Sequence, residues 1–166
     1  MASGEVIMTT IAFRNGVLAA DGRMTRGTQL VTDSFNKIVD CEERNYSMQG
    51  EKVLAFALAG YLSEKAVLEY ALGEGLFVTS SLDTPNTFSA IIVTERTAWS
   101  VAKPDEESPI LDFVEIPDGC PWAIGSGGTV ALHYLTSTDC DPLDAVVQAM
   151  KTDTGSGGET TRWSRA

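Results

Sequence analysis

The sequence predicts an α+β fold in which strands come first and last and helices lie between them. An apolar stretch that runs into the dipeptide Asn15-Gly16 predicts a β-hairpin over residues 10–20, because Asn-Gly suits the type I′ turn that joins two twisted strands. The run Val53–Leu58 is continuously apolar, which is typical of a strand covered on both faces. Because strands and helices are grouped rather than alternating, we expect packed layers and not repeated βαβ units.

Helices are expected in three places. Ser63 is the expected cap of the first helix, which runs to about Leu72 and stops at two glycines, Gly73 and Gly75. Its expected apolar stripe consists of Ala66, Val67, Tyr70 and Ala71. A second, short helix is expected from about Thr129 to Leu135.

The third helix has the clearest start signal in the chain. Asp141 is a capping carboxylate, Pro142 stands in the first turn, and Asp144 adds a second acid at the positive end of the helix dipole. This helix is expected to end near Lys151. The side chains that it should direct inward are Leu143, Val146, Val147 and Met150.

The remaining segments read as strands, turns and loops. Residues 29–41 are mixed and residues 76–87 are rich in loop formers. A short strand is expected at the end of the chain. The other expected strands are Phe88–Val93 and Thr97–Val101, paired about residues 94–96, then Ile110–Ile116, which ends at the turn Pro117-Asp118-Gly119, and Trp122–Ile124, which leads into Gly125–Gly128.

Composition excludes several classes of function. With 166 residues the chain is expected to form one domain, and its net charge of −11 argues against nucleic-acid binding. Solubility explains that charge most simply, and a basic partner surface is the alternative. No apolar run approaches the ~20 residues of a membrane span, and residues 1–8 do not form a secretory signal. Three cysteines without CxxC spacing favour a reducing cytoplasm and no metal site.

Histidine-dependent catalysis has little support in this sequence. His133 is the only histidine, and we interpret it as an ordinary helix residue. Ser126 and Ser156 follow glycines but lack the first glycine of a Gly-x-Ser-x-Gly elbow. The glycine-rich segment Gly125–Gly128 could bind phosphate, but no Lys-Ser or Lys-Thr follows it, so a P-loop is weakly supported.

A threonine at a chain terminus needs no histidine, because its own α-amino group, with a pKa near ~8, can act as the base. Residues at equal distances from the Asn15-Gly16 turn face each other, so Thr10 faces Asp21 and a carboxylate lies beside Thr9. A nearby lysine ammonium would lower the proton affinity of the nucleophile, and Lys37 is the candidate. Each of these residues also has an ordinary explanation when it is considered alone. Thr9 could simply favour a strand, Asp21 could be a turn residue, and Lys37 could be a surface lysine.

In these features the chain resembles the proteasome β-subunit and HslV family of N-terminal-threonine hydrolases. Six segments match in family order, and the spacing from Asp21 to Lys37 is preserved. The matching segments are Thr9-Thr10-Ile11-Ala12, Ala20-Asp21-Gly22-Arg23-Met24-Thr25, Asn36-Lys37-Ile38, Leu58-Ala59-Gly60, Ala123-Ile124-Gly125-Ser126-Gly127-Gly128 and Asp153-Thr154-Gly155-Ser156-Gly157-Gly158. The resemblance implies a four-layer αββα sandwich of the N-terminal nucleophile hydrolase type. The stretch between Gly60 and Ile91 is too short for two long helices, so the helical layer after the first helix is expected to be trimmed.

The resemblance also implies roles for individual residues. Thr9 would be the nucleophile, Asp21 and Lys37 its charged partners, and the Gly60 amide the oxyanion donor. Three further residues, Ser126, Asp153 and Ser156, would orient the terminal amine. Thr25 would pair with the substrate backbone, and an apolar specificity pocket would be lined by Met24, Phe35, Val39 and Leu58. Neither a cofactor nor a metal is implied.

Residues 1–8 are expected to be an extension or propeptide ahead of a single domain, residues 9–166. While Met8 remains bonded to Thr9, the threonine nitrogen is an amide and cannot act as a base; an internal start at Met8 followed by methionine removal would expose Thr9 directly. One hypothesis is a threonine peptidase that loses residues 1–8, forms a homo-oligomeric ring in the cytoplasm and cleaves polypeptides supplied by an ATP-dependent unfoldase. The alternative is a non-catalytic structural or assembly protein, for example a viral, virion-associated one, that keeps its extension.

Overall fold

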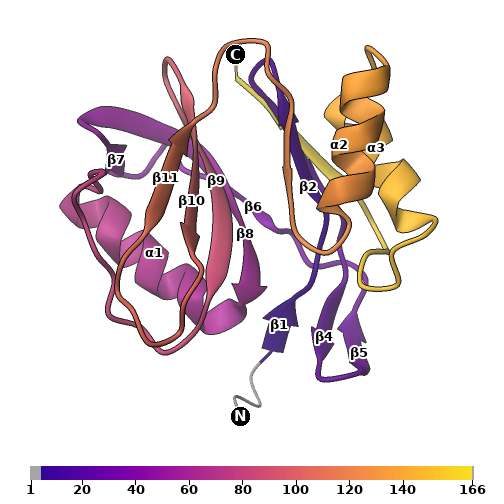
Figure 1. Ribbon diagram of the computed structural model, residues 1–166, viewed down its shortest axis with the longest axis horizontal. Coiled ribbons are helices and arrows are strands. Elements are labelled where there is room, and N and C mark those ends of the chain that lie inside the picture. Colours follow the sequence, from indigo (N-terminus) through magenta and orange to yellow (C-terminus); the bar gives the residue numbers. More distant parts are fainter. Residues whose placement is uncertain (1–4, 166) are drawn as a thin grey trace.

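The computed structural model describes residues 5–165 and has a mixed α+β fold built mostly from antiparallel strands, as the sequence predicts (Figure 1). The described residues form three helices: α1 (Leu62–Glu74), α2 (Gly128–Ser137) and α3 (Pro142–Met150). None of the helices in this part of the chain is long and apolar enough to cross a membrane.

Two sheets carry the fold. The larger sheet has the strand order β11-β10-β9-β8-β1-β4-β5, with β6 and β7 also paired to β8, and the smaller sheet has the order β12-β2-β3-β13. The strands of the larger sheet are β1 (Glu5–Ile7), β4 (Met24–Arg26), β5 (Gln29–Thr32), β6 (Ile38–Asp40), β7 (Ser47–Met48), β8 (Glu51–Tyr61), β9 (Phe88–Thr94), β10 (Ala98–Lys103) and β11 (Asp112–Glu115). Those of the smaller sheet are β2 (Ile11–Arg14), β3 (Val17–Ala20), β12 (Trp122–Ile124) and β13 (Thr161–Ser164).

Three apolar clusters join the helices and sheets into layers. The first lies between α1 and one face of the larger sheet and includes Phe56, Leu58 and Leu72. The second joins the two sheets and the third joins the smaller sheet to α2 and α3, so the helix pair and α1 lie on opposite outer sides (Figure 1). Between Gly60 and Ile91 the described chain forms α1 as its only helix.

Strand β8 explains why the run Val53–Leu58 is apolar throughout. Phe56 and Leu58 belong to the cluster under α1, whereas Ala55 and Ala57 belong to the cluster between the sheets. Successive side chains of a strand point to opposite faces. Both faces of β8 are therefore buried, as predicted, although the strand is longer than the predicted segment.

The predicted hairpin is confirmed as β2 and β3. Asn15 and Gly16 have φ angles of 51° and 75°, as a type I′ turn requires. Ile11 pairs with Ala20, and the Asp21 amide donates to the Thr10 carbonyl at 3.3 Å. The register that places Asp21 beside the start of β2 therefore holds.

Helix α1 departs from the prediction. It begins at Leu62, and the cap residue is Tyr61 without a side-chain cap bond, so Ser63 is not the cap. The buried face consists of Glu64, Leu68 and Leu72, whereas Tyr70, on the predicted stripe, is 74% exposed. The helix has apolar residues on two sides, and packing against the larger sheet selects the leucine side. Its end at Gly75 is as predicted, but Gly73 lies inside the helix.

Helix α3 begins and ends as predicted. The Asp141 side chain accepts a hydrogen bond from the Leu143 amide at 3.1 Å, and the helix is followed by Lys151 at its C-cap. Its inward face differs in part from the prediction, because Val147 is 40% exposed. The two small residues Ala145 and Ala149 are buried instead and allow close contact with the smaller sheet.

Candidate active site

Thr9, Asp21 and Lys37 lie together in the interior. One carboxylate oxygen of Asp21, Oδ1, accepts hydrogen bonds from the Thr9 hydroxyl and from the Lys37 ammonium, the latter at 2.7 Å. The side chains of Lys37 and Asp21 have no exposed surface, and Thr9 is also fully buried. The structure thus brings together the three residues that the sequence analysis assigns to the nucleophile and its charged partners.

The chain holds this carboxylate with main-chain donors as well. Asp21 directly follows β3, and its Oδ1 accepts from the Thr10 amide at 3.1 Å. Its other oxygen, Oδ2, accepts from the Gly157 amide at 2.8 Å and from the Arg23 amide at 3.4 Å. A buried charge is tolerated only when it is paired and hydrogen-bonded, and Asp21 meets both conditions.

Burial lowers the pKa of Lys37 to about 8, although the neighbouring Asp21 carboxylate opposes the shift. Lys37 immediately precedes β6, which pairs with β8, and its buried side chain reaches Asp21 at the end of β3. Its ammonium also donates to the Met8 carbonyl at 3.3 Å. A lysine with this pKa can give and take a proton near neutral pH.

A second polar cluster lies on the other side of Thr9. Asp153 Oδ2 accepts hydrogen bonds from the hydroxyls of Ser126, at 2.6 Å, and Ser156, at 2.5 Å. Ser126 also donates to the Thr9 carbonyl at 3.4 Å. Burial alone would raise the pKa of Asp153, but the bonds from Ser126, Ser156 and Gly155 outweigh it and lower that pKa. The three residues predicted to orient a terminal amine are therefore connected to one another and to Thr9.

Thr10 was missed as a site residue. It is fully buried, and its hydroxyl lies 2.8 Å from that of Ser156, so it joins the second cluster to the strand that follows Thr9. The hairpin register indicates that Thr10 lies beside Asp21, but no sequence signal identifies Ser156 as a partner so far along the chain. His133, by contrast, is exposed on α2 and lies in neither cluster.

Two glycines of the site stand where a side chain would collide with neighbouring backbone. Gly125 has a φ of +91°, and a Cβ atom there would lie 2.1 Å from the Thr9 carbonyl oxygen. Gly60 has a φ of +136°, and a Cβ atom there would lie 2.9 Å from the Thr87 carbonyl oxygen. Side chains are excluded at both positions, and the oxyanion role of the Gly60 amide stays a prediction.

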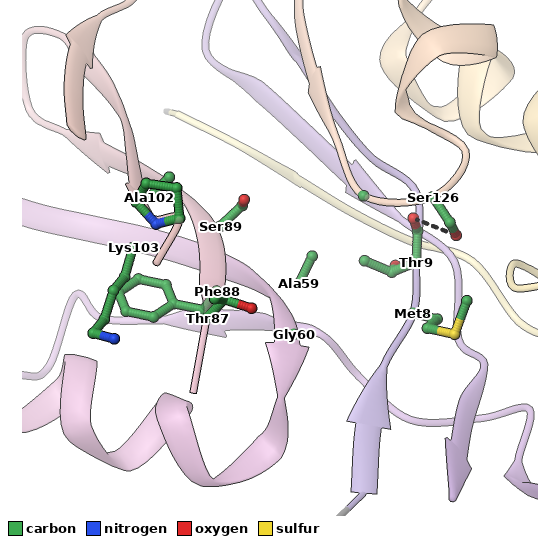
Figure 2. Close-up of a pocket in the computed structure, with 12 residues that line it drawn as sticks. Met8, Thr9, Ala59, Gly60, Thr87, Phe88, Ser89, Ala102, Lys103 and Ser126 are labelled. Carbon is green, nitrogen blue, oxygen red and sulfur yellow. Dashed lines mark hydrogen bonds between the residues drawn. The ribbon is translucent and has the colours of Figure 1, made fainter. Parts of the chain in front are cut away.

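A cavity of about 340 Å³ adjoins Thr9 (Figure 2). Thr9 and Ser126 lie on one side of it and Phe88, Ser89 and Lys103 on the other. The lining residues are Met8, Thr9, Ala59, Gly60, Thr87, Phe88, Ser89, Ala102, Lys103, Pro104, Gly125 and Ser126. Thr9 borders this space although its own relative exposure to solvent is 0%.

The residues predicted to line an apolar specificity pocket lie away from this cavity. Phe35 and Val39 pack against the cluster that contains Leu58, between α1 and the larger sheet. Met24 is buried at the start of β4. None of these residues, and not Thr25, lines the cavity beside Thr9, so their part in substrate specificity stays a prediction.

The residues just ahead of Thr9 form β1, a strand of the larger sheet. It is hydrogen-bonded to β4 on one side and β8 on the other, with Val6 opposite Thr25 and Ile7 opposite Gly60. Thr25, the residue assigned to substrate pairing, therefore pairs with the chain's own extension. Because β1 leads directly to Met8, the Met8–Thr9 bond lies against the cluster of Asp21 and Lys37.

No protein-family model matches this sequence, and a search of curated proteins finds no significant match. Within residues 5–165, no group of three or more histidine, cysteine or acidic side chains is arranged to hold a metal ion. The three cysteines are free thiols, and burial raises the pKa of Cys41 to about 12. The functional assignment therefore depends on the geometry around Thr9.

Proposed function

We propose that this chain is the precursor of a threonine peptidase of the proteasome β-subunit and HslV type, in which Thr9 becomes the N-terminal nucleophile once residues 1–8 are removed. The observation that carries this proposal is the buried cluster of Thr9, Asp21 and Lys37. A hydroxyl, a carboxylate and a lysine with a lowered pKa meet there, and the bond that precedes the hydroxyl is presented to them. Perturbed titratable groups beside a cavity are typical of catalytic sites.

The layers support the same assignment. The order of a helix, two facing sheets and a helix pair is what the N-terminal nucleophile hydrolase sandwich requires, and α1 alone covers the larger sheet as the trimmed version would have it. In this interpretation residues 9–166 are the mature domain and residues 1–8 the propeptide.

Self-cleavage would begin at the Met8 carbonyl carbon. The Thr9 oxygen forms a bond to this carbon, and its proton passes by way of Asp21, to which the hydroxyl is already hydrogen-bonded, to the neutral amine of Lys37. An N–H of Lys37, whose nitrogen lies 3.3 Å from the Met8 oxygen, donates to the carbonyl and polarises it. The C–N bond then breaks as the nitrogen takes a proton, which frees the Thr9 amine and leaves residues 1–8 as an ester on the Thr9 oxygen. Water hydrolyses this ester, which releases residues 1–8 and restores the hydroxyl.

In the mature enzyme the freed amine is the base. It takes the proton of its own hydroxyl as the oxygen attacks a substrate carbonyl, and passes a proton to the leaving amine when the C–N bond breaks. Water then hydrolyses the acyl-enzyme ester. Ser126, with Asp153 and Ser156 behind it, holds the chain beside the amine, and the Gly60 amide is the proposed donor to the oxyanion.

We expect self-cleavage to depend on pH through Lys37. Because the pKa of Lys37 is lowered to about 8, the neutral amine that can accept the Thr9 proton accumulates as the pH rises through this value. The rate at which residues 1–8 are lost, followed by mass spectrometry over a pH series, should therefore rise with an inflection near 8. Lys37→Arg, which cannot lose its proton, should remove the inflection, and a rate that is flat or falls with pH in the unchanged protein would refute this role.

The proposed setting is a homo-oligomeric ring in the cytoplasm, fed with polypeptide by an ATP-dependent unfoldase. Leu30 and Val31 on the edge strand β5 are 51% and 45% exposed. Unpaired edge strands with apolar side chains are ready contact surfaces. This edge is where we expect a neighbouring copy to pack.

One observation favours the non-catalytic alternative. Strand β1 is paired on both sides, so residues 5–7 of the extension are an integral part of the larger sheet. A structural or assembly protein, for example a virion-associated one, could retain it permanently. Persistence of residues 1–8 in the mature protein would favour that function.

Covalent labelling tests the proposed function. A peptide epoxyketone or a β-lactone added to the cleaved protein should form one adduct, and peptide mapping should find it on the peptide that begins with Thr9. Failure to form an adduct, or an adduct on any other residue, would contradict a threonine peptidase.

A further inference from the structure

The cavity beside Thr9 arises from small side chains in one row of the larger sheet. Strand pairing places Ala59, Ser89 and Ala102 side by side across β8, β9 and β10. Directly paired residues share a face of a sheet. This face is turned toward the smaller sheet, because Ala59 belongs to the apolar cluster that joins the two sheets. The next rows along β9 carry Ile91 and Val93, which fill the space between the sheets.

The opposite wall is the catalytic centre itself. Thr9, Gly125 and Ser126 border the cavity from the side of the smaller sheet, and Gly60 lies at its edge (Figure 2). The cavity therefore opens between the proposed oxyanion donor and the residues that would orient the amine. A volume of about 340 Å³ is within the range of sites that bind small ligands or side chains.

The lining is uncharged apart from one lysine. Lys103 is 1% exposed, and its ammonium donates to the carbonyl oxygens of Asp105, at 2.7 Å, and Glu106, at 3.3 Å. No carboxylate lines the cavity. Apolar side chains such as Phe88 and Ala102, hydroxyl groups and the Lys103 side chain form the walls, which suits an apolar or weakly polar occupant.

The path of the chain indicates which part of a substrate would enter. Strand β1 and Met8 occupy the positions ahead of the scissile carbonyl, between β4 and β8. A bound peptide that followed β1 could not continue along Thr9 into β2, because the enzyme's own chain fills that path. The space open beside Thr9 is this cavity.

We propose that the cavity binds the side chain of the residue immediately after the scissile bond and selects small or medium apolar side chains there. This inference rests on the proposed peptidase function and adds its specificity on the leaving-group side. Ala102 and Ser89, whose side chains limit the depth of the cavity, are the specificity-determining residues.

The test uses peptides that are identical ahead of the scissile bond and differ only in the next residue, with Ala, Leu, Lys and Asp compared. The cleaved wild-type protein should have a kcat/KM at least about tenfold higher for Leu than for Lys or Asp, as a fitted apolar pocket provides. Ala102→Leu fills the cavity. In this variant the kcat/KM for the peptide with Leu after the scissile bond should fall about tenfold or more relative to that for the peptide with Ala there. Ala66→Leu, an equal change at an exposed position of α1, should leave the preference unchanged.

Covalent labelling of Thr9 distinguishes failure of this subsite proposal from failure of the proposed peptidase function. A peptide epoxyketone carries no residue on the leaving-group side, so Ala102→Leu should be labelled at the wild-type rate. If wild-type Thr9 is not labelled, the proposed function fails. The proposed role of the cavity fails if labelling is normal but the wild-type protein shows no preference for the residue after the scissile bond. It fails likewise if Ala102→Leu leaves that preference unchanged. Should Ala102→Leu lose labelling altogether, the same comparison with Ser89→Val decides the question.

Discussion

Replacing Thr9 with alanine should leave residues 1–8 attached and abolish covalent labelling. Alanine has no oxygen to attack the Met8 carbonyl, and loss of a nucleophile lowers turnover by on the order of 10⁴-fold or more. Intact mass and electrophile labelling of Thr9→Ala measure both effects. Thr136→Ala, at an exposed position of α2, is the matched control and should behave as wild type.

A serine variant refines this result. Thr9→Ser retains the hydroxyl that donates to Asp21 and should therefore keep partial self-cleavage and labelling. Full labelling of Thr9→Ala would exclude Thr9 as the nucleophile, whatever the serine variant does.

Replacing Lys37 with alanine should reduce both stability and activity strongly. The Lys37–Asp21 pair is 2.7 Å apart with no exposed side-chain surface, so Lys37→Ala leaves a buried carboxylate without its cation. Breaking one partner of a buried pair costs about 3–5 kcal/mol of unfolding free energy. Denaturant unfolding measures this cost, and the labelling rate of Thr9 measures the chemical loss.

A double variant separates the structural role of the pair from its chemical role. Asp21→Asn with Lys37→Met removes both charges and should recover most of the unfolding free energy, because no unpaired charge remains, while self-cleavage and labelling stay absent. The exposed pair between Arg162 and Asp141 provides a control, since Arg162→Ala should cost less than about 1 kcal/mol. If Lys37→Ala retained wild-type labelling, the lysine would have no part in the mechanism.

Local sequence signals were enough to predict that Asp21 lies beside the threonines at the start of β2. The Asn15-Gly16 turn determines the register of β2 and β3, and that register alone places Asp21 beside Thr10. The position of Lys37 was predicted only through the resemblance, because no local rule relates β6 to the hairpin. The spacing from Asp21 to Lys37, which matches the family motif, indicated the role of Lys37, whereas hydrophobic periodicity did not.

Features that depend on distant segments were not predictable. Helix α1 has two apolar sides, and only its packing against the larger sheet decides that Leu68 and Leu72 are buried. Likewise, the contact of Thr10 with Ser156 depends on a loop far along the chain. The cavity depends on the register of three strands, which sequence patterns do not specify. The pairing of β1 with β4 and β8 was not expected either.

The most direct test of the account is the intact mass of the purified protein after incubation, read together with its N-terminal residue. The account predicts loss of residues 1–8 and a new chain that begins with a free Thr9 amine. A full-length chain that remains uncleaved at a pH above about 8, where neutral Lys37 is abundant, would contradict it.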